Sequence, residues 1–395
     1  MELYSSNENY KLYEGNMLDM LEVIEFNSID SIITDPPYEL NFMNKGWDNS
    51  GIAFQKETWQ KCYEVLKPGG YLLAFGGTRT FHRIACAIED AGFEIRDTIM
   101  WLYGSGFPKS MNIGPAIDKK NDSEETKRWA GWGTALKPAY EPIIVARKPY
   151  KGSCVDNILK YDVGGLNIDE CRVPSKPGEY DIRHYTQEDC FQNLKPKQSH
   201  YQVKPQPEGR FPANVIFTYD DTDKEDVCGG FPNSDNGNND SAARYFYCAK
   251  ASKRDRDEGL DAFPDKFYGQ SGGAQAAIAR GESYSKGSGF NTAKVRKNTH
   301  PTVKPTSLMQ YLVRLVTPKG GTILDTFNGS GSTGKAAMYE NKEKNKGYKY
   351  IGIELTEEYL PISKARIEYV CNLIEEEKRQ DKQMTIFDLG EENGK

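Results

Sequence analysis

The stretch of sequence that decides the fold runs from residue 319 to residue 354. It consists of KGGTILDTF (319–327), NGSGSTG (328–334), KAAMYE (335–340) and, after a polar gap, YKYIGIE (348–354). Two apolar runs of strand length enclose a glycine turn and a helical segment, and the second run ends in an acid. Glycines let backbone amides approach a ligand, and an acid at this offset can bind ribose hydroxyls. The stretch therefore predicts a nucleotide-type pocket.

The glycine turn alone is compatible with several cofactors. Gly329, Gly331 and Gly334 match G-x-G-x-x-G, and Glu354 follows 20 positions later, as in dinucleotide-binding folds. The turn also nearly matches a phosphate-binding loop, but Ala336 stands where a Ser or Thr hydroxyl should hold magnesium, so an ATPase is the weaker interpretation. A flexible linker would not lie between two apolar strands. The turn predicts a cofactor pocket and leaves NAD open.

A second motif lies far upstream, where the apolar run SIDSIIT (28–34) leads into Asp35-Pro36-Pro37-Tyr38. Two prolines remove two amide donors, so backbone carbonyls here lack ladder partners and can point into a pocket beside the carboxylate. An acid and a bare carbonyl form an acceptor pair that suits an exocyclic amino group, and the tyrosine offers a flat face for its ring. Alone, the string would be a rigid turn after a strand. Combined with a cofactor pocket, it predicts an amine-binding catalytic motif.

Together the two motifs resemble those of the amino-group DNA methyltransferases that use S-adenosyl-L-methionine. The resemblance rests on Asp35-Pro36-Pro37-Tyr38 and on DTFNGSG (325–331). Their order along the chain resembles that of the circularly permuted β class, in which the catalytic motif comes first. Further segments that resemble the family, in the family's order, are LKPGGYLLAFGGTRTFHR (66–83), WLYGSGFPKS (101–110), GWGTALKPAYEPIIVARKP (131–149), YFYCAKASKRDR (245–256) and HPTVKP (300–305). The resemblance covers most of the chain.

The resemblance implies a role for each matching residue. Asp35 and the Pro36 carbonyl would hold the target amine in a segment stiffened by Pro37, and Tyr38 would stack on the extruded base. The implied S-adenosyl-L-methionine contacts are Asn16 near the adenine, Asp325, Phe327, Gly329, Ser330 and Gly331 along the methionine and ribose, Glu354 on the ribose hydroxyls, and His300, Lys304 and Pro305 over the amino-acid end.

Two positions depart from the family pattern. Thr326 stands where family members usually have Pro after the acid of the glycine motif, and Asn16 stands where an N-terminal Gly-Asp pair has its Asp. An amide can still hydrogen-bond adenine. We therefore expect an altered cofactor affinity rather than a loss of activity.

Composition and segmentation predict one α/β fold with an insertion. The chain has 395 residues, 37% of them hydrophobic, which is enough to bury a full core. Residues 1–150 and 300–375 alternate strand-like and helical runs, which predicts a Rossmann-like, mainly parallel sheet with helices on both faces, made from a catalytic half and a cofactor-binding half. Residues 151–299, rich in Gly, Pro, Asn and Asp, would form a loop-rich target-recognition region, with loops expected at 233–241 and 269–289. The aromatics in GRFPANVIF (209–217) and YFYC (245–248) predict that this region is at least partly folded, and residues 376–395 would form a charged tail. The predicted strands are SIIT, YLLAF, TIMWL, PIIVA, TILDTF and YIGIE, and the predicted helices are 52–66, 80–92, 306–316 and 334–341.

The sequence also indicates the cellular compartment and whether a metal site is expected. No apolar run approaches membrane-spanning length, and MELYSSNENY lacks the apolar core of a signal peptide, which predicts a soluble, cytoplasmic protein with no membrane partner. Eight cysteines contain no C-x-x-C pair, and four histidines form no H-E-x-x-H motif. We therefore expect reduced thiols and no metal site.

Double-stranded DNA is the expected partner, although the net charge is −6. Phosphate contacts supply much of DNA affinity, so basic residues must be clustered locally. The segment 151–299 has 21 Lys+Arg against 22 Asp+Glu and is the less acidic part of the chain. Candidate phosphate contacts are Lys250, Lys253, Arg254, Arg256, Lys294, Arg296, Lys297, Arg79, His82 and Arg83, each of which could equally lie on an ordinary solvated face.

The tail contains a separate signal. After a charged helix that we expect to end near Arg379, the segment Gln383-Met384-Thr385-Ile386-Phe387 resembles the peptide with which bacterial proteins dock on the DNA polymerase sliding clamp. An amphipathic tail that folds back on its own domain is the alternative. A homodimer is a further expected possibility for the active form.

These observations predict methyl transfer from S-adenosyl-L-methionine to the N6 amine of a flipped-out adenine in DNA. Adenine is preferred over cytosine N4 because the resemblance makes Asp-Pro-Pro-Tyr typical of adenine enzymes. The alternatives from other classes are an NAD-dependent oxidoreductase, an RNA or protein amine methyltransferase, and a non-catalytic DNA-binding relative. The oxidoreductase would share the glycine turn but gives no reason for the segment from Asp35 to Tyr38.

Overall fold

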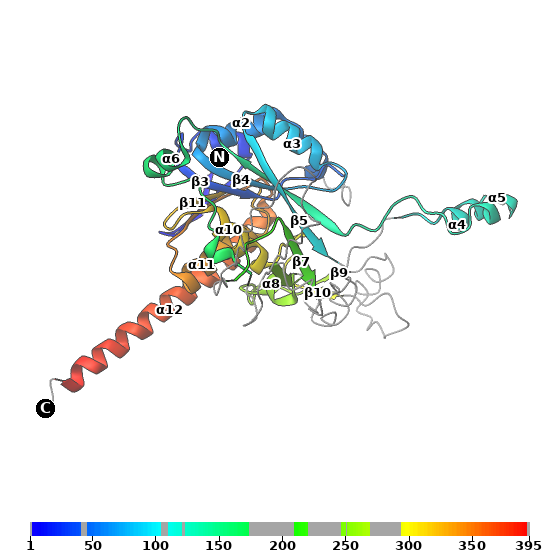
Figure 1. Ribbon diagram of the computed structural model, residues 1–395. Helices are drawn as coiled ribbons and strands as arrows, with labels where there is room; N and C mark the ends of the chain where they lie inside the picture. The colour runs from blue at the N-terminus through cyan, green and yellow to red at the C-terminus, as the bar shows by residue number, and fades with distance from the viewer. Residues whose placement is uncertain are drawn as a thin grey trace, which may run out of the picture.

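The computed structural model describes residues 2–40, 46–103, 110–120, 123–173, 209–219, 246–249, 251–268 and 294–392. Ten strands form the main sheet, and helices cover both of its faces (Figure 1). A separate antiparallel pair joins β9 (Lys266–Tyr268) to β10 (Lys294–Arg296). Among the helices within these ranges, none combines the length and apolar composition that a membrane span requires.

The main sheet has the strand order β1-β2-β12-β11-β3-β4-β6-β5-β7-β8. Its strands are β1 (Glu2–Ser6), β2 (Tyr10–Glu14), β3 (Ile29–Thr34), β4 (Leu66–Phe75), β5 (Glu94–Tyr103), β6 (Tyr140–Arg147), β7 (Val215–Tyr219), β8 (Phe246–Ala249), β11 (Thr322–Asp325) and β12 (Lys349–Glu354). Six neighbouring pairs are parallel, including the whole run from β2 to β4. Three pairs are antiparallel. The predicted mainly parallel sheet is confirmed, and all six predicted strands are present.

Burial on both faces explains why these strands are continuous apolar runs. Ile33 and Leu73 point to one core, whereas their neighbours Ile32 and Leu72 point to the other. The first core is covered by α10 (Thr306–Val316), α11 (Ser332–Lys344) and the start of α12 (Leu360–Glu392), and the second by α1 (Met17–Leu21), α2 (Lys56–Val65) and α3 (Phe81–Asp90). The helix predictions at 52–66, 80–92, 306–316 and 334–341 are confirmed, with ends shifted by a few residues.

The two halves of the chain meet between β11 and β3. Residues Ile323 and Leu324 pair in parallel with Ser31 and Ile32, almost three hundred positions away. From β11 the chain passes through α11 to β12 on one side, and from β3 it passes through α2 to β4 on the other. Such a reversal of strand order opens a crevice at the carboxyl ends of the strands, where α/β proteins bind ligands.

The middle segment contributes directly to the main sheet. Strand β7 pairs in parallel with β5, and β8 pairs in parallel with β7, so both extend the edge of the catalytic half. The expectation that the aromatic stretches 209–217 and 245–248 fold in part is therefore confirmed. Helices α6 (Cys154–Tyr161) and α8 (Lys253–Asp257) also belong to this segment. The predicted loops NSDNGNNDS (233–241) and GQSGGAQAAIARGESYSKGSG (269–289) lie outside the described residues.

Two helical features extend away from the sheet in Figure 1. One is an arm between β5 and β6 that carries α4 (Ile113–Asp118) and α5 (Ser123–Arg128). The other is the distal part of α12, whose first turns pack against α11. The expected helix end near Arg379 is wrong, because α12 continues to Glu392 and includes Gln383–Phe387 in its backbone. The side chains of that segment lie outside the described part, and clamp docking stays a prediction.

Candidate active site

A cavity of about 840 Å³ opens where β3, β11 and β12 end. Twelve of the fourteen predicted site residues line it: Asn16, Asp35, Pro36, Pro37, Tyr38, His300, Lys304, Asp325, Phe327, Gly329, Ser330 and Glu354. Gly331 and Pro305 lie behind the wall, the former at the start of α11 and the latter at the start of α10. The fold thus brings the upstream acid motif and the downstream glycine motif to one cavity.

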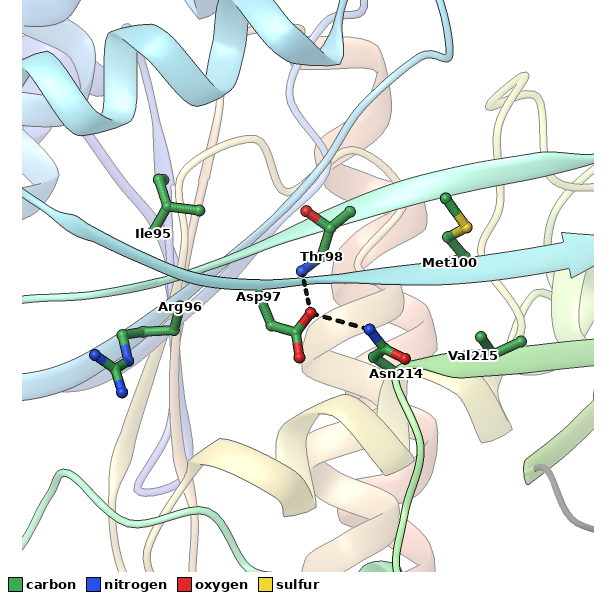
Figure 2. Close-up of a pocket in the computed structure, with 7 residues that line it drawn as sticks. All are labelled: Ile95, Arg96, Asp97, Thr98, Met100, Asn214 and Val215. Carbon is green, nitrogen blue, oxygen red and sulfur yellow. Dashed lines mark hydrogen bonds between the residues drawn. The ribbon is translucent and has the colours of Figure 1, made fainter. Parts of the chain in front are cut away.

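A second hollow, of about 500 Å³, lies on β5 and the start of β7 (Figure 2). Its only lining carboxylate, Asp97, accepts hydrogen bonds from the Thr98 backbone N–H at 2.7 Å and the Asn214 side-chain amide at 3.0 Å. No glycine turn borders this hollow. The hollow lies away from the carboxyl ends of the strands, so the cavity at the point where the strand order reverses is the candidate active site.

The three glycines of the turn each permit a close approach. Gly329 (φ 52°) and Gly331 (φ 72°) adopt left-handed conformations that favour glycine. A Cβ on Gly329 would lie 2.8 Å from the His300 ring, and one on Gly331 would lie 2.6 Å from the Ser363 hydroxyl. On Gly334 it would lie 2.6 Å from atoms of α12 and β12, so this glycine serves helix packing. The turn is therefore a tightly packed backbone loop, which we call the glycine cradle, that requires glycine at all three positions.

Asp325 organises the turn from within the protein. Its carboxylate accepts hydrogen bonds from the hydroxyls of Thr34 and Thr333, both at 2.7 Å, and from the Phe327 backbone N–H at 3.1 Å. Burial raises the pKa of Asp325 to about 6, although these donors lower it. The Thr326 hydroxyl, which stands in place of the family's proline, lies 3.3 Å from that of Thr34. These bonds join the end of β11 to the end of β3.

Glu354 stands at the end of β12 with its carboxylate on the cavity wall. One oxygen accepts from the Gly329 backbone N–H at 2.6 Å, and the other accepts from the Thr356 backbone N–H at 2.8 Å. Burial raises the pKa of Glu354. Asn16 lies on the same side, where its side-chain oxygen caps α1 by accepting from the Leu18 N–H at 3.0 Å. Asn16 is exposed and lines the cavity.

Asp35 faces the cavity from the end of β3. Its Oδ2 accepts a hydrogen bond from Lys304 Nζ at 2.7 Å, whereas its Oδ1 is buried and has no hydrogen-bond partner within the described ranges. No described residue donates to the Pro36 carbonyl either. Burial raises the pKa of Asp35, and the Lys304 charge opposes that rise. Leaving a buried acceptor without a hydrogen bond costs free energy. Asp35 Oδ1 and the Pro36 carbonyl oxygen are therefore suited to accept hydrogen bonds from a ligand.

The segment around Tyr38 is fixed by residues that sequence reasoning missed. The Asp48 carboxylate accepts from the backbone N–H groups of Glu39 (2.9 Å) and Leu40 (3.2 Å), and Glu39 adopts a left-handed conformation with φ 55°. The Tyr38 hydroxyl donates to Glu141 Oε2 at 2.8 Å. Asp48 belongs to no motif quoted above, and Glu141 lies within the family-like segment 131–149, in which no site residue was predicted from the sequence.

Comparison with known proteins matches this arrangement. A family model described as DNA methylase, of the N6/N4 type, covers residues 29–365, which is most of the chain. The chain belongs to the N6/N4 DNA methylase family.

Individual relatives match shorter parts of the methylase chain. The type II methyltransferase M.HindIII of Haemophilus influenzae is 26% identical over 200 residues, which is 40% of this chain and 64% of the relative. M.HpaI of Haemophilus parainfluenzae is 35% identical over 114 residues, 27% of this chain and 36% of the relative. The chain thus spans less than two thirds of either relative.

Solved structures align over nearly the whole methylase chain at low identity. The PvuII DNA methyltransferase (cytosine-N4-specific) gives a TM-score of 0.42 and 15% identity, with 95% of each chain covered. The M1.HpyAVI–SAM complex gives a TM-score of 0.38 and 16% identity, covering 91% of this chain and 99% of that one.

His300 borders the cavity of the methylase next to the glycine turn. Its ring packs edge-on against Tyr359 at 4.6 Å, and burial lowers the pKa of His300 to about 3, so the imidazole is neutral. Ser330 is held from behind by Arg366, which donates to its hydroxyl at 2.9 Å and to its backbone oxygen. Arg366 also donates to the Asp255 carbonyl of α8 at 2.7 Å. The glycine turn is thereby tied to the middle segment.

The candidate phosphate contacts lie in different settings. Arg79 is exposed on the cavity rim. Arg254 pairs with Glu258 at 2.8 Å, and Lys297 donates to the Asp261 carbonyl at 2.8 Å. Of the remainder, Lys253 is exposed, Arg256 and Arg296 are half-buried, His82 packs edge-on against Phe81, Arg83 lies over Phe54, and Lys250 and the Lys294 side chain lie outside the described residues.

Proposed function

We propose that the protein is a β-class DNA methyltransferase that transfers a methyl group from S-adenosyl-L-methionine to the N6 amine of adenine. The observation that carries the proposal is the buried Oδ1 of Asp35, which has no hydrogen-bond partner among the described residues and belongs to a side chain that lines the same cavity as the glycine turn and Glu354. The type II methyltransferases among its relatives support the same reaction class.

The residues present fit S-adenosyl-L-methionine. Glu354 offers carboxylate lone pairs for the ribose hydroxyls beside the glycine cradle, and the neutral His300 ring abuts that cradle. Asn16 offers an amide at the end where the adenine is expected. When bound, the cofactor supplies an electrophilic methyl group on a sulfonium. Lys304 is directed toward Asp35 instead, so its predicted place over the amino-acid end of the cofactor stays a prediction.

The target amine would meet two acceptors at Asp35 and Pro36. If Asp35 Oδ1 and the Pro36 carbonyl each accept one N–H, the nitrogen lone pair is held toward the cavity. The nitrogen becomes cationic on methylation, and Asp35 Oδ1 is placed to take the proton that restores its neutrality. The Tyr38 ring lies beside this position and offers a stacking surface for the base.

The base must leave the duplex to reach these groups, which costs about a few kcal/mol that stacking and hydrogen bonds offset. Arg79, exposed on the cavity rim, is the candidate contact for a phosphate next to the extruded nucleotide. Its replacement by alanine would weaken binding to all sequences alike and reduce the salt dependence.

The proposal is tested by expressing the protein in cells that lack other DNA methyltransferases and sequencing their DNA by a single-molecule method. We expect N6-methyladenine in one sequence context, and none from the Asp35→Asn variant, which keeps the shape of the side chain. N4-methylcytosine would move the protein to the alternative reaction of the same family. Unmodified DNA from well-folded wild-type protein would contradict the proposal.

A further inference from the structure

Lys304 lies between two carboxylates at the floor of the cavity. Its Nζ is 2.7 Å from Asp35 Oδ2 and 3.3 Å from Glu141 Oε2, and only 8% of its side chain is exposed. The rings of Phe75 and Tyr38 flank the ammonium group at 4.8 and 5.5 Å. The two carboxylates raise the pKa of Lys304, so this lysine remains a cation. It therefore cannot serve as a base.

Glu141 contacts Tyr38 and Lys304, the two side chains described above beside Asp35, and no hydrogen bond joins it to Asp35 in the described part of the chain. Its Oε2 accepts from the Tyr38 hydroxyl at 2.8 Å and from Lys304. Glu141 is the second residue of β6, and this strand is otherwise apolar from Pro142 to Ala146. A carboxylate in such a place needs partners, and the Tyr38 hydroxyl and the Lys304 ammonium, both of which line the cavity, are two of them.

The charge balance gives this second carboxylate a purpose. Asp35 paired with Lys304 alone would be a neutral pair, with little net field to stabilise a positive charge that develops on the target nitrogen. With Glu141 present, one cation is shared between two carboxylates, and the cluster keeps a net negative charge beside Asp35 Oδ1. The bond to Tyr38 also fixes the orientation of the ring on which the base would stack.

We propose that Glu141 is a positioning residue for amine methylation. Through Lys304 it keeps a net negative charge beside the free oxygen of Asp35, and through Tyr38 it holds the stacking ring in place. This inference rests on the proposed function. It concerns a residue for which no role was predicted from the sequence, and it places Lys304 beside the hydrogen-bond acceptors of the target amine.

The inference has a signature in the pH profile. Ionisation of Asp35 is required for it to accept hydrogen bonds and a proton, so the acidic limb of the rate profile follows its pKa. The Glu141 charge raises that pKa. Glu141→Gln should therefore lower the plateau and at the same time move the acidic limb to lower pH. The charged or titratable groups that face this cluster are Lys304, Tyr38, Glu141, Tyr103 of β5 and Asp325 of β11.

The test is a single-turnover methylation assay on unmethylated DNA with full-length protein between pH 5.5 and 8.5. For Glu141→Gln we expect a plateau rate lower by about tenfold to a hundredfold and an acidic limb at lower pH. Binding of the cofactor analogue sinefungin and of DNA, measured by calorimetry, should stay within about threefold of wild type. Glu141→Asp, which restores the charge, should return the limb to its wild-type position and recover part of the rate.

The matched control is Glu94→Gln. Glu94 also pairs with a cation of the main sheet, Arg147 at 2.6 Å, but it does not line the cavity. We expect a wild-type rate and profile for this variant. A Glu141→Gln rate that is unchanged, or that falls without a shift of the limb, would overturn the inference and leave the proposed function standing. Wild-type protein that transfers no methyl group would overturn both.

Discussion

Replacing Asp325 by Asn should remove a pH dependence of stability that the buried carboxylate imposes on the fold. The side chain is 2% exposed, and burial raises its pKa from 3.8 to about 6. One pKa unit corresponds to about 1.4 kcal/mol, so ionising this group in the folded protein costs about 3 kcal/mol. Because the folded-state pKa is the higher one, the folded protein holds the proton more tightly. Its contribution to stability is present below pH 4 and is lost as the pH rises through 6.

The assay is urea unfolding of the ligand-free protein, followed by circular dichroism at several pH values between 4 and 7. The quantity to compare is the free energy of unfolding of the wild type minus that of Asp325→Asn, because other titrating groups cancel in this difference. We expect it to fall by about 3 kcal/mol across this range. A difference that stays constant, or that grows with pH, would refute the assignment of Asp325 as a buried carboxylate that organises the turn.

Two further substitutions test the packing around the glycine turn. Gly334→Ala places a methyl group 2.6 Å from Ile367 and should lower the free energy of unfolding by about 1 to 3 kcal/mol. The control Gly165→Ala, whose Cβ would have an ordinary contact at 3.7 Å, should lower it less. Equal urea midpoints for the two variants would contradict this expectation. Lys335→Met removes the buried ion pair with Glu258 (2.8 Å) and should lower the free energy of unfolding by about 3 kcal/mol. The double variant with Glu258→Gln should recover part of that loss, and a double variant less stable than Lys335→Met would argue against the pairing.

The central strands were predictable because both of their faces are buried. A parallel strand between two helical layers is mostly apolar on both faces, and SIIT, YLLAF and TILDTF are near-continuous apolar runs with a few buried polar residues. Strand β1, by contrast, has the sequence ELYSS and is largely exposed at the sheet edge. Edge strands need only half of their side chains to be apolar, so no run marks them. The pairing of β7 with β5, and of β8 with β7, is likewise set by tertiary contacts that local sequence does not encode.

The site was predictable where a motif carries the chemistry. Asp35 and Glu354 each follow a strand and belong to patterns whose spacing has a physical reason, and both line the cavity. Glu141 was missed because its role depends on Lys304, which lies more than 160 positions away in sequence and meets it only in the folded chain. Glu141 lies within the family-like segment 131–149, but a lone carboxylate at the start of an apolar strand does not by itself indicate a role.

The C-terminal end of α12 was predicted too early in the sequence. No Gly or Pro interrupts the sequence between Pro361 and Gly390, and most residues of this stretch are good helix formers. The backbone consequently continues as helix past Arg379. The resemblance of Gln383–Phe387 to a docking peptide led to the expectation of an extended tail, although local propensity favours helix there.

The most direct measurement is a crystal structure of the protein with sinefungin, an analogue of S-adenosyl-L-methionine that carries an amine in place of the sulfonium methyl. The account predicts that its ribose hydroxyls bind Glu354 and that its amine enters the cavity within reach of Asp35 Oδ1. An analogue bound elsewhere, or with its amine directed away from Asp35, would contradict the account.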